Sequence, residues 1–442
     1  MDEQFIGAEG ARHMSKESNR SISMLTIVKG IVSMLPALII IVVTLGAGAC
    51  GDHSPFAPLT TTPTPTGLTP TISMTATVTF AVGMRSTPAP TSAGGFAFVT
   101  NFADGNVSSY SRDASTGALT LMQTANAGAE QGPQGVAVSQ DNHTLYVANY
   151  ADDNIYEFAI SPITGNLTAL PGAPIANGHG SGPQQIALNP AHSLPGDFAW
   201  VTGGKDGTIT TYTIGAGGLL SYSSHITGLA APFAIAIDPA AKFLYASDFT
   251  AGVILSYQID PATGALTQSG APVNSLGASR GKPAFVTLDP TGNFLYADDN
   301  AAGVVSVFNV SNGTPVFVSQ IPSQPTRNAP FGMGAAASVS GKYLIAANQG
   351  GASLSAFLID HPQAPGILGT YGNRDLSQPT GLAIDADSKF AYTTNMAGGT
   401  VSQFTLNASC PKATAALCYT GSAVTENPPN PESQPYGIAL TR

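Results

Sequence analysis

Residues 232–267 read PFAIAIDPAAKFLYASDFTAGVILSYQIDPATGALT and contain the pattern of one structural unit. An apolar segment (PFAIAI) is followed by a turn, a second apolar segment (FLYASD), a turn at Gly252, an alternating segment (VILSYQI) and the turn DPATG. Short alternating runs bounded by Gly, Pro, Asn and Asp are typical of β-strands joined by tight turns. The stretch therefore predicts three antiparallel strands and the start of a fourth.

The same pattern recurs about every fifty residues. Segments that begin with proline and continue as an apolar strand start 50, 49, 51, 47, 49 and 56 residues apart, at Pro133, Pro183, Pro232, Pro283, Pro330, Pro379 and Pro435. A fixed period in this range indicates a solenoid, a propeller or an array. Four strands per unit is the content of a propeller blade, and seven units fill residues 94–442.

The two ends of this region complement each other. Residues 96–101 (FAFVTN) match a second strand without a first, and residues 435–442 (PYGIALTR) match a first strand without a second. We therefore predict an all-β fold, a seven-bladed β-propeller of four-stranded antiparallel blades that is closed by pairing of the N- and C-terminal strands. Closure removes exposed strand edges, which otherwise promote aggregation.

The N-terminal part of the chain has a different composition. Residues 30–49 carry no charge, follow Lys29 and precede Cys50. Such a run is long enough to span a bilayer and also fits a secretory signal. The segment AGAC at residues 47–50 resembles a bacterial lipobox, which implies that Cys50 is lipidated; an uncleaved membrane anchor is the alternative for residues 1–50. Either interpretation places the propeller in the cell envelope, tethered to the membrane and outside the cytoplasm, with the proline- and threonine-rich residues 51–93 as an extended tether.

Charge and cysteine content narrow the possible partners. The chain has 16 Lys and Arg against 26 Asp and Glu, a net charge of −10, and only 10% charged residues, which excludes a basic nucleic-acid-binding surface. With Cys50 lipidated, Cys410 and Cys418 remain, eight positions apart, and outside the cytoplasm we expect them to form a disulfide. Two free thiols are the alternative. We expect the protein to be a monomer.

The repeats resemble the lactonase-type seven-bladed propellers, the family of bacterial 6-phosphogluconolactonase and fungal carboxymuconate cyclase. The resemblance rests on IDPATGALT at residues 259–267, SPITGNLT at 161–168 and LYVAN at 145–149, the last of which is also similar to the Tyr-Val-Thr-Asn repeats of surface-layer propellers. It implies a site in an axial funnel, where the loops preceding the first strands meet the turns after the second strands. In members with lactonase activity, His and Arg follow several of the prolines and a Glu ends one second strand.

Two sets of residues are predicted to line this funnel. One follows the prolines and the other ends the second strands: Gln134, Gln184, Phe233, Phe331 and Tyr436, and Asn101, Asn149, Asp248, Asn348 and Asn395. Amides and aromatics stand where the family has acid–base groups, and they bind ligands without moving protons at neutral pH. The first hypothesis is therefore a membrane-tethered protein that binds a small molecule, a glycan or a peptide in its funnel.

The second hypothesis is a lactone-ring hydrolase with a relocated site. Its candidate catalytic residues combine carboxylates with nearby cations: Asp298, Asp299, Lys282, Arg280 and His179. Such a cluster would supply a general base, or would hold a divalent cation such as Ca²⁺. The alternative for these residues is that Asp caps turns and that Lys and Arg are solvated on loops.

Overall fold

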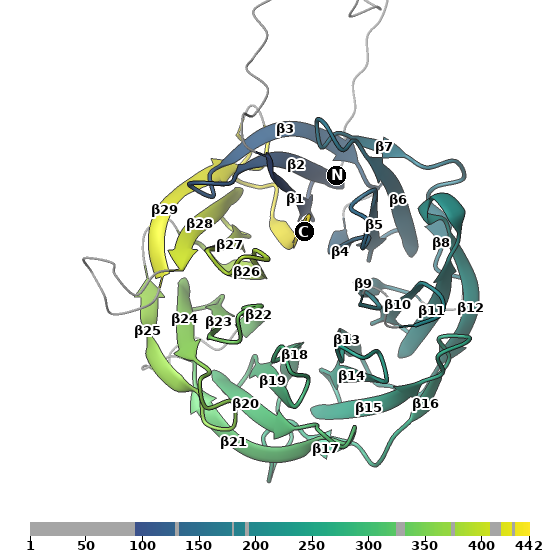
Figure 1. Ribbon diagram of the computed structural model, residues 1–442, viewed down its shortest axis with the longest axis vertical. Coiled ribbons are helices and arrows are strands. Elements are labelled where there is room, and N and C mark those ends of the chain that lie inside the picture. The colour runs from purple at the N-terminus through teal and green to yellow at the C-terminus, as the bar shows by residue number, and fades with distance from the viewer. Residues whose placement is uncertain are drawn as a thin grey trace, which may run out of the picture. The chain divides into compact units, whose positions relative to one another are not determined.

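Seven antiparallel sheets surround a central axis and form a closed ring (Figure 1). The computed structural model describes residues 93–128, 132–178, 181–190, 194–323, 332–372, 376–406, 417–426 and 429–442. In this part of the chain, five sheets have four strands, and two have a short fifth strand that pairs with the third. The predicted seven-bladed β-propeller is confirmed.

In each blade the first strand lies nearest the axis and the fourth lies outermost (Figure 1). The first strands are β4 (Pro133–Val138), β9 (Pro183–Leu188), β13 (Pro232–Ile237), β18 (Pro283–Leu288), β22 (Gly332–Ala337), β26 (Pro379–Ile384) and β30 (Pro435–Leu440). The second strands are β1 (Ala93–Asn101), β5 (Thr144–Asn149), β10 (Phe198–Gly203), β14 (Phe243–Asp248), β19 (Phe294–Asp299), β23 (Tyr343–Asn348) and β27 (Phe390–Asn395).

The outer strands complete the blades. The third strands are β2 (Asn106–Asp113), β6 (Asn154–Ile160), β11 (Thr208–Ile214), β15 (Val253–Ile259), β20 (Val304–Asn309), β24 (Ser353–Leu358) and β28 (Thr400–Leu406). The fourth strands are β3 (Leu119–Asn126), β7 (Leu167–Ala169), β12 (Leu220–Ile226), β16 (Leu266–Gln268), β21 (Val316–Pro322), β25 (Gly366–Gly372) and β29 (Leu417–Val424). The additional strands β8 (Ile175–Ala176) and β17 (Val273–Asn274) pair with β6 and β15, and a short 3₁₀ helix (Ala216–Gly218) precedes β12.

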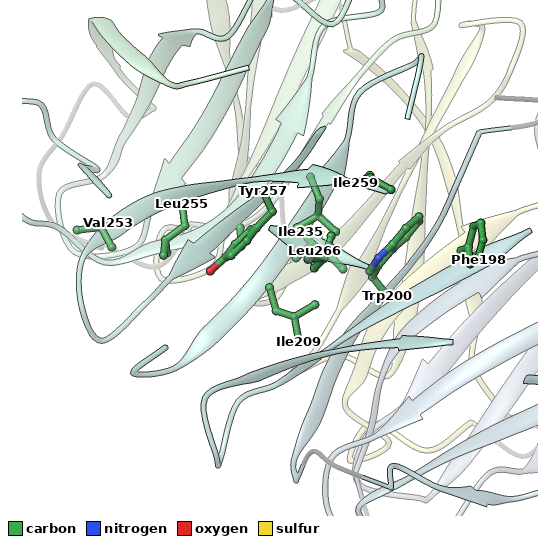
Figure 2. Packing of buried hydrophobic residues seen from close by; sticks show 11 residues of the cluster. Phe198, Trp200, Ile209, Ile235, Val253, Leu255, Tyr257, Ile259 and Leu266 are labelled. Carbon is green, nitrogen blue, oxygen red and sulfur yellow. The ribbon is translucent and has the colours of Figure 1, made fainter. Parts of the chain in front are cut away.

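The core lies between neighbouring blades. One large residue per second strand is fully buried there: Phe98, Tyr146, Trp200, Tyr245, Tyr296, Ile345 and Tyr392. Trp200 packs among Ile235, Tyr257 and Leu266 of the next blade (Figure 2), and its indole N–H donates to the carbonyl of Gly264 in that blade at 2.9 Å. The large residues therefore join the blades, as expected for a repeat whose units cannot bury their apolar faces alone.

The turn from the first to the second strand carries the same hydrogen bond in every blade. The residue six positions after the start of the first strand accepts, through a side-chain oxygen, a backbone N–H of the second strand at 2.5–2.9 Å. The donor is the residue that opens the second strand in six blades and Phe96, within β1, in the closing blade. The acceptors are Ser139, Asn189, Asp238, Asp289, Ser338, Asp385 and Thr441. Short polar side chains satisfy turn N–H groups in this way, so these residues set the register of each blade.

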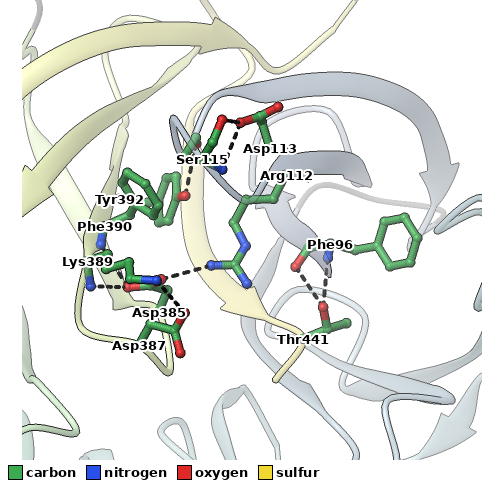
Figure 3. A network of polar contacts seen from close by, with 11 residues as sticks. Phe96, Arg112, Asp113, Ser115, Asp385, Asp387, Lys389, Phe390, Tyr392 and Thr441 are labelled. Atoms are coloured by element: carbon green, nitrogen blue, oxygen red, sulfur yellow. Dashed lines mark hydrogen bonds and ion pairs between the residues drawn. The ribbon is translucent and has the colours of Figure 1, made fainter. Parts of the chain in front are cut away.

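The closing blade is built like the others although its strands come from the two ends of the chain. β30 pairs antiparallel with β1, with Pro435 opposite Asn101, and the Phe96 N–H donates to Thr441 Oγ1 at 2.7 Å. A buried ion pair, 3.4 Å between Arg112 Nη1 and Asp385 Oδ2, joins this blade to its neighbour (Figure 3). The predicted closure is confirmed.

We count the blades along the chain from the closing blade, which contains β1. The sixth unit is then the one predicted to begin at Pro330, and it starts two residues later than the proline pattern predicts. β22 begins at Gly332, which pairs with Asn348, and Ser338 forms the turn hydrogen bond six positions after it. The predicted start at Pro330 is wrong because Gly332 is the residue that pairs with the last residue of the second strand, so the position equivalent to Gln184 is Met333 rather than Phe331. Phe331 itself lies outside the described residues.

Several predictions about targeting and about the cysteines concern residues outside the described part of the chain. These are the apolar run at residues 30–49, Cys50, the tether and Cys410. Cys418, on β29, is disulfide-bonded. Within the residues that the structure describes, no helix combines the length and the apolar character needed to cross a bilayer.

Candidate functional site

A cavity of about 690 Å³ lies on the propeller axis, and all seven first strands or the turns that follow them contribute to its wall. Gln134, Gln184 and Tyr436 line it near the start of their strands. The first strands start beside the ends of the second strands, as the pairing of Pro133 with Asn149 shows. The described members of both predicted sets of funnel residues therefore lie at one end of the axis, which we call the mouth of the channel.

Two amide oxygens at the mouth lack a partner. Among the described residues, no donor reaches Oε1 of Gln134 or Oε1 of Gln184, and both atoms are buried. Gln185, next in the chain, differs because its Oε1 accepts the backbone N–H of Ile235 in the following blade. A buried polar atom without a hydrogen bond costs about 1–3 kcal/mol, so Gln134 and Gln184 are positioned to gain from a ligand or water that donates to them.

The residue after each second strand shapes the mouth. In the third blade this residue is Gly204, and a Cβ placed there would lie 2.4 Å from Gln184 Nε2. In the closing blade the Phe102 ring packs 6.3 Å from the Tyr436 ring. This position was not among the predicted site residues, although Phe102, Tyr150 and Phe249 at equivalent places give an aromatic signal in the sequence.

Phe233 stands in an aromatic corner between the fourth and fifth blades. Its ring lies 5.9 Å from that of Phe249 and 5.8 Å, edge-on, from that of Phe285. Lys282 Nζ lies over the Phe249 ring at 4.9 Å, a cation–π arrangement. The structure thus brings together Phe233 and Lys282, which the sequence assigned to the two different hypotheses, and adds Phe285, which lines the channel.

The asparagine side chains that end four of the second strands form hydrogen bonds within the fold. Asn101, Asn348 and Asn395 each donate through Nδ2 to a serine of the adjacent third strand at 2.8–3.0 Å. Asn149 accepts two turn N–H groups, at 3.1 Å each. All four side chains are buried. Asn149 therefore caps the turn that follows it, and the other three join the second strand to the third. Among the described residues, Oδ1 of Asn101 and Oδ1 of Asn395 have no hydrogen-bond partner.

The carboxylates of Asp248 and Asp299 accept hydrogen bonds both from the turn that follows their strand and from the loop that precedes the first strand. Asp248 accepts the N–H groups of Ala230 at 2.6 Å and of Ala251 at 2.9 Å. Asp299 accepts the N–H of Lys282 at 2.6 Å, two turn N–H groups and the Ser275 hydroxyl. Because these donors already engage the carboxylate oxygens, the geometry favours a structural role for both residues.

Asp298 points to the other face of its strand, away from Asp299. It is fully buried, and neither of its carboxyl oxygens has a hydrogen-bond partner among the described residues. Burial, and secondarily the neighbouring charge of Asp299, raises the pKa of Asp298 well above its usual value. The two aspartates therefore do not converge on one site, and Asp298 is held as a neutral acid over an extended pH range.

The remaining candidates of the second hypothesis are dispersed. Arg280 is exposed on the loop before β18, and His179 lies outside the described residues. In the part of the chain that the structure describes, no group of three or more His, Cys, Asp or Glu side chains is arranged to hold a metal ion. The described residues thus define a propeller whose candidate binding site is the partly aromatic mouth of its axial channel, with Lys282 in its aromatic corner.

Comparison with known proteins agrees with this class. Residues 87–194 match the family model described as Lactonase, 7-bladed beta-propeller. A 6-phosphogluconolactonase of Pectobacterium carotovorum is 29% identical over 172 residues, which are 36% of this chain and 49% of that relative. The chain thus spans about half the length of that curated relative. The predicted resemblance to the lactonase-type seven-bladed propellers is confirmed.

Solved structures extend the similarity of the fold to the whole ring. A Bacteroides uniformis protein has a TM-score of 0.66 at 18% identity, over 78% of this chain and 99% of its own. The periplasmic gluconolactonase of Pseudomonas aeruginosa has a TM-score of 0.63 at 15% identity, over 79% of this chain and 99% of its own. At these identities the likeness concerns the fold alone.

Proposed function

We propose that this lactonase-type propeller binds an uncharged small molecule at the mouth of its axial channel. The observation that carries the proposal is the pair of buried amide oxygens of Gln134 and Gln184 in the channel wall, which have no hydrogen-bond partner among the residues that the structure describes. An amide offers both a donor and an acceptor, so it matches hydroxyl, ester or amide groups of a ligand. A glycan or a peptide would present the same groups, but a cavity of this size fits a small molecule.

We also propose that binding takes place outside the cytoplasm on a membrane-tethered protein. This part of the proposal rests on the sequence, on the uncharged run at residues 30–49 and the lipobox-like segment that ends at Cys50. Replacing Cys50 by Ser should leave an unprocessed precursor or release the protein from membranes. Palmitate labelling that is unchanged in Cys50→Ser would contradict lipidation at this residue.

Lactone-ring hydrolysis is the second candidate function, favoured by the family-model match and by the Pectobacterium relative. Ring opening needs a base that activates water and a donor or cation that stabilises the oxyanion. Among the described candidates, Asp248 and Asp299 are engaged by backbone N–H groups, and Asp298 is buried with a raised pKa. Binding is therefore ranked ahead of hydrolysis.

Calorimetric titration of the full-length protein with δ-valerolactone, glucono-δ-lactone and 6-phosphogluconate tests this ranking. We expect the neutral lactones to bind. The double change Gln134→Leu and Gln184→Leu should weaken binding by roughly tenfold, since each lost hydrogen bond contributes about 0.5–1.5 kcal/mol. Gln268→Leu, at an exposed glutamine of an outer strand, is the matched control and should bind as the wild type does.

Base uptake during the same reactions separates the two functions. Under binding alone, the lactones should open at the rate seen in buffer. Turnover well above that rate would make hydrolysis the main function. Absence of binding by either neutral lactone would overturn the proposal itself.

A further inference from the structure

We infer that the ligand carries an unbranched aliphatic chain that extends from the mouth down the axial channel. The inference rests on the binding function proposed above and specifies its ligand class. The polar head would meet Gln134 and Gln184, and the chain would run along the first strands toward the opposite end. An alkyl-substituted lactone has both parts.

The wall of the channel below the mouth is aliphatic. The fourth residue of five first strands contributes to it, and further aliphatic residues follow in two of these strands: Val136, Ile235, Val286, Leu382 and Ile438, then Ile237 and Leu288. Each methylene group that is moved from water into such surroundings gains free energy. Six-residue strands that rise about 3.3 Å per residue make the wall roughly 20 Å long, which accommodates an extended chain.

The opposite end of the channel combines apolar residues with Asp289 and Arg442, the charged residues of the described wall. Four residues at the seventh position after the start of a first strand line it: Pro190, Pro239, Pro290 and Val339. Proline has no backbone N–H to offer a polar ligand. Val339 is 63% exposed although it is a large hydrophobic residue. A polar mouth above an aliphatic wall matches a molecule with a polar head and a hydrocarbon tail.

The charges in the described channel wall do not suit a phosphorylated sugar. Its charged residues are Asp289 and Arg442, both toward the far end. The Asp289 carboxylate accepts the N–H groups of Asn293 and Phe294, and the Arg442 guanidinium donates to Gln140 Oε1. Arg442 is thus already partnered and lies far from the amides of the mouth. A neutral amphiphile fits this wall better than an anionic sugar does.

A chain-length series tests the inference on the full-length protein. We expect the affinity for δ-hexalactone, δ-octalactone, δ-decalactone and δ-dodecalactone to rise with length, up to about fourfold for each methylene group buried. Ala236→Asp places a carboxylate in the channel wall and should abolish this dependence while δ-valerolactone still binds. Ala262→Asp, on an exposed outer turn, is the matched control and should keep the dependence.

The outcomes separate this inference from the proposed function. If affinity stays flat along the series while δ-valerolactone binds and needs Gln134 and Gln184, the chain does not enter the channel and only the inference fails. If no lactone of any length binds, both fail. A length dependence that survives Ala236→Asp would place the tail elsewhere and overturn the inference. Should Ala236→Asp not fold, Thr287→Val keeps the shape of the wall and should raise affinity for δ-dodecalactone severalfold; no rise would count against the inference.

Discussion

The two ends of the propeller axis differ in how much they vary between blades. At the far end, a Ser, Thr, Asn or Asp oxygen accepts the same backbone N–H in all seven blades, including the one made from both chain ends. At the mouth, the residue after the start of the first strand is Gln, Gln, Phe, Ala, Met, Thr or Tyr. A repeated hydrogen bond specifies the fold, whereas a position that varies among the blades is free to serve a ligand.

The mouth itself is not uniform. Thr380, which stands at the equivalent place in the seventh unit, bonds to the Thr394 hydroxyl at 2.8 Å and donates to the Pro435 carbonyl at 3.2 Å. Gln134 and Gln184 have amide oxygens without such partners among the described residues. The variable residues at the mouth are therefore of two kinds. Some join neighbouring blades, and others leave polar atoms available for a ligand; only the second kind supports binding.

Removing the strand that closes the ring should have the largest effect. Deletion of residues 435–442 takes away β30, its pairing with β1 and the Thr441 cap on Phe96. We expect aggregation or loss of a cooperative thermal transition, because β1 would become an exposed edge. Thr441→Ala, which removes only the cap, should cost about 1 kcal/mol. A deleted protein that melts at the wild-type temperature would show that the two ends do not close the ring.

Breaking the buried ion pair between Arg112 and Asp385 at the far end should have the second-largest effect on stability. Asp385→Ala leaves Arg112 without its partner and removes the cap on Phe390, so we expect a loss of about 3–5 kcal/mol in urea unfolding. Asp387→Ala is the control, because its pair with Lys389 is exposed and contributes at most about 1 kcal/mol. Equal losses in the two variants would contradict the structural role of the far end.

The buried carboxyl group of Asp298, beneath the mouth, should make the free energy of unfolding depend on pH, with an effect of intermediate size. Because burial raises the pKa of Asp298, the folded protein retains a proton that the unfolded chain loses above the usual pKa of Asp. The contribution of this group to stability is therefore fully present below that pH and is lost as pH rises toward the raised pKa. Asp298→Asn should remove that decline.

Urea unfolding at several pH values between 4 and about 8 measures this effect. The quantity to compare is the pH dependence of the free energy of unfolding in wild type and in Asp298→Asn. Asp299→Asn is the contrasting change, because it alters a carboxylate that accepts four hydrogen bonds, and it should destabilise at neutral pH. If wild type and Asp298→Asn show the same pH slope, Asp298 titrates normally and the account of its burial is wrong.

Changing the mouth should affect stability least. Gln134→Leu and Gln184→Leu remove buried oxygens that have no partner in the described part of the chain, so the free energy of unfolding should stay within about 1 kcal/mol of wild type or rise slightly. Thermal unfolding of each variant checks this. A large loss of stability would mean that these amides serve the fold, as Gln185 does, and would remove the contrast between the two ends.

The sequence predicts the fold better than the site for a physical reason. Repeat period, blade number and closure follow from alternation and turn residues, which act locally. The period failed only in the sixth unit, where Pro330 resembles a strand start but the turn hydrogen bond of Ser338 sets the register from Gly332. Strict alternation along a strand already implies that Asp298 and Asp299 face opposite sides, so their separation was predictable.

Most of the mouth was not predictable from local pattern. That Gln185 has a partner for its amide oxygen while Gln134 and Gln184 do not depends on how neighbouring blades approach each other. The corner formed by Phe233, Phe249 and Lys282 likewise combines a strand, a turn and a loop that are distant in sequence. Such contacts arise from the closed ring and leave no periodic signal.

Hydrogen–deuterium exchange of the full-length protein, with and without saturating δ-valerolactone, tests most directly whether the variable mouth binds the ligand. This lactone has a head and no tail, so it reports on the mouth alone. The account predicts slower exchange around residues 133–136, 183–186 and 435–438, with residues 238–243 and 289–294 at the far end unchanged. Protection centred on the far-end turns, or bound ligand with no protection at the mouth, would contradict it.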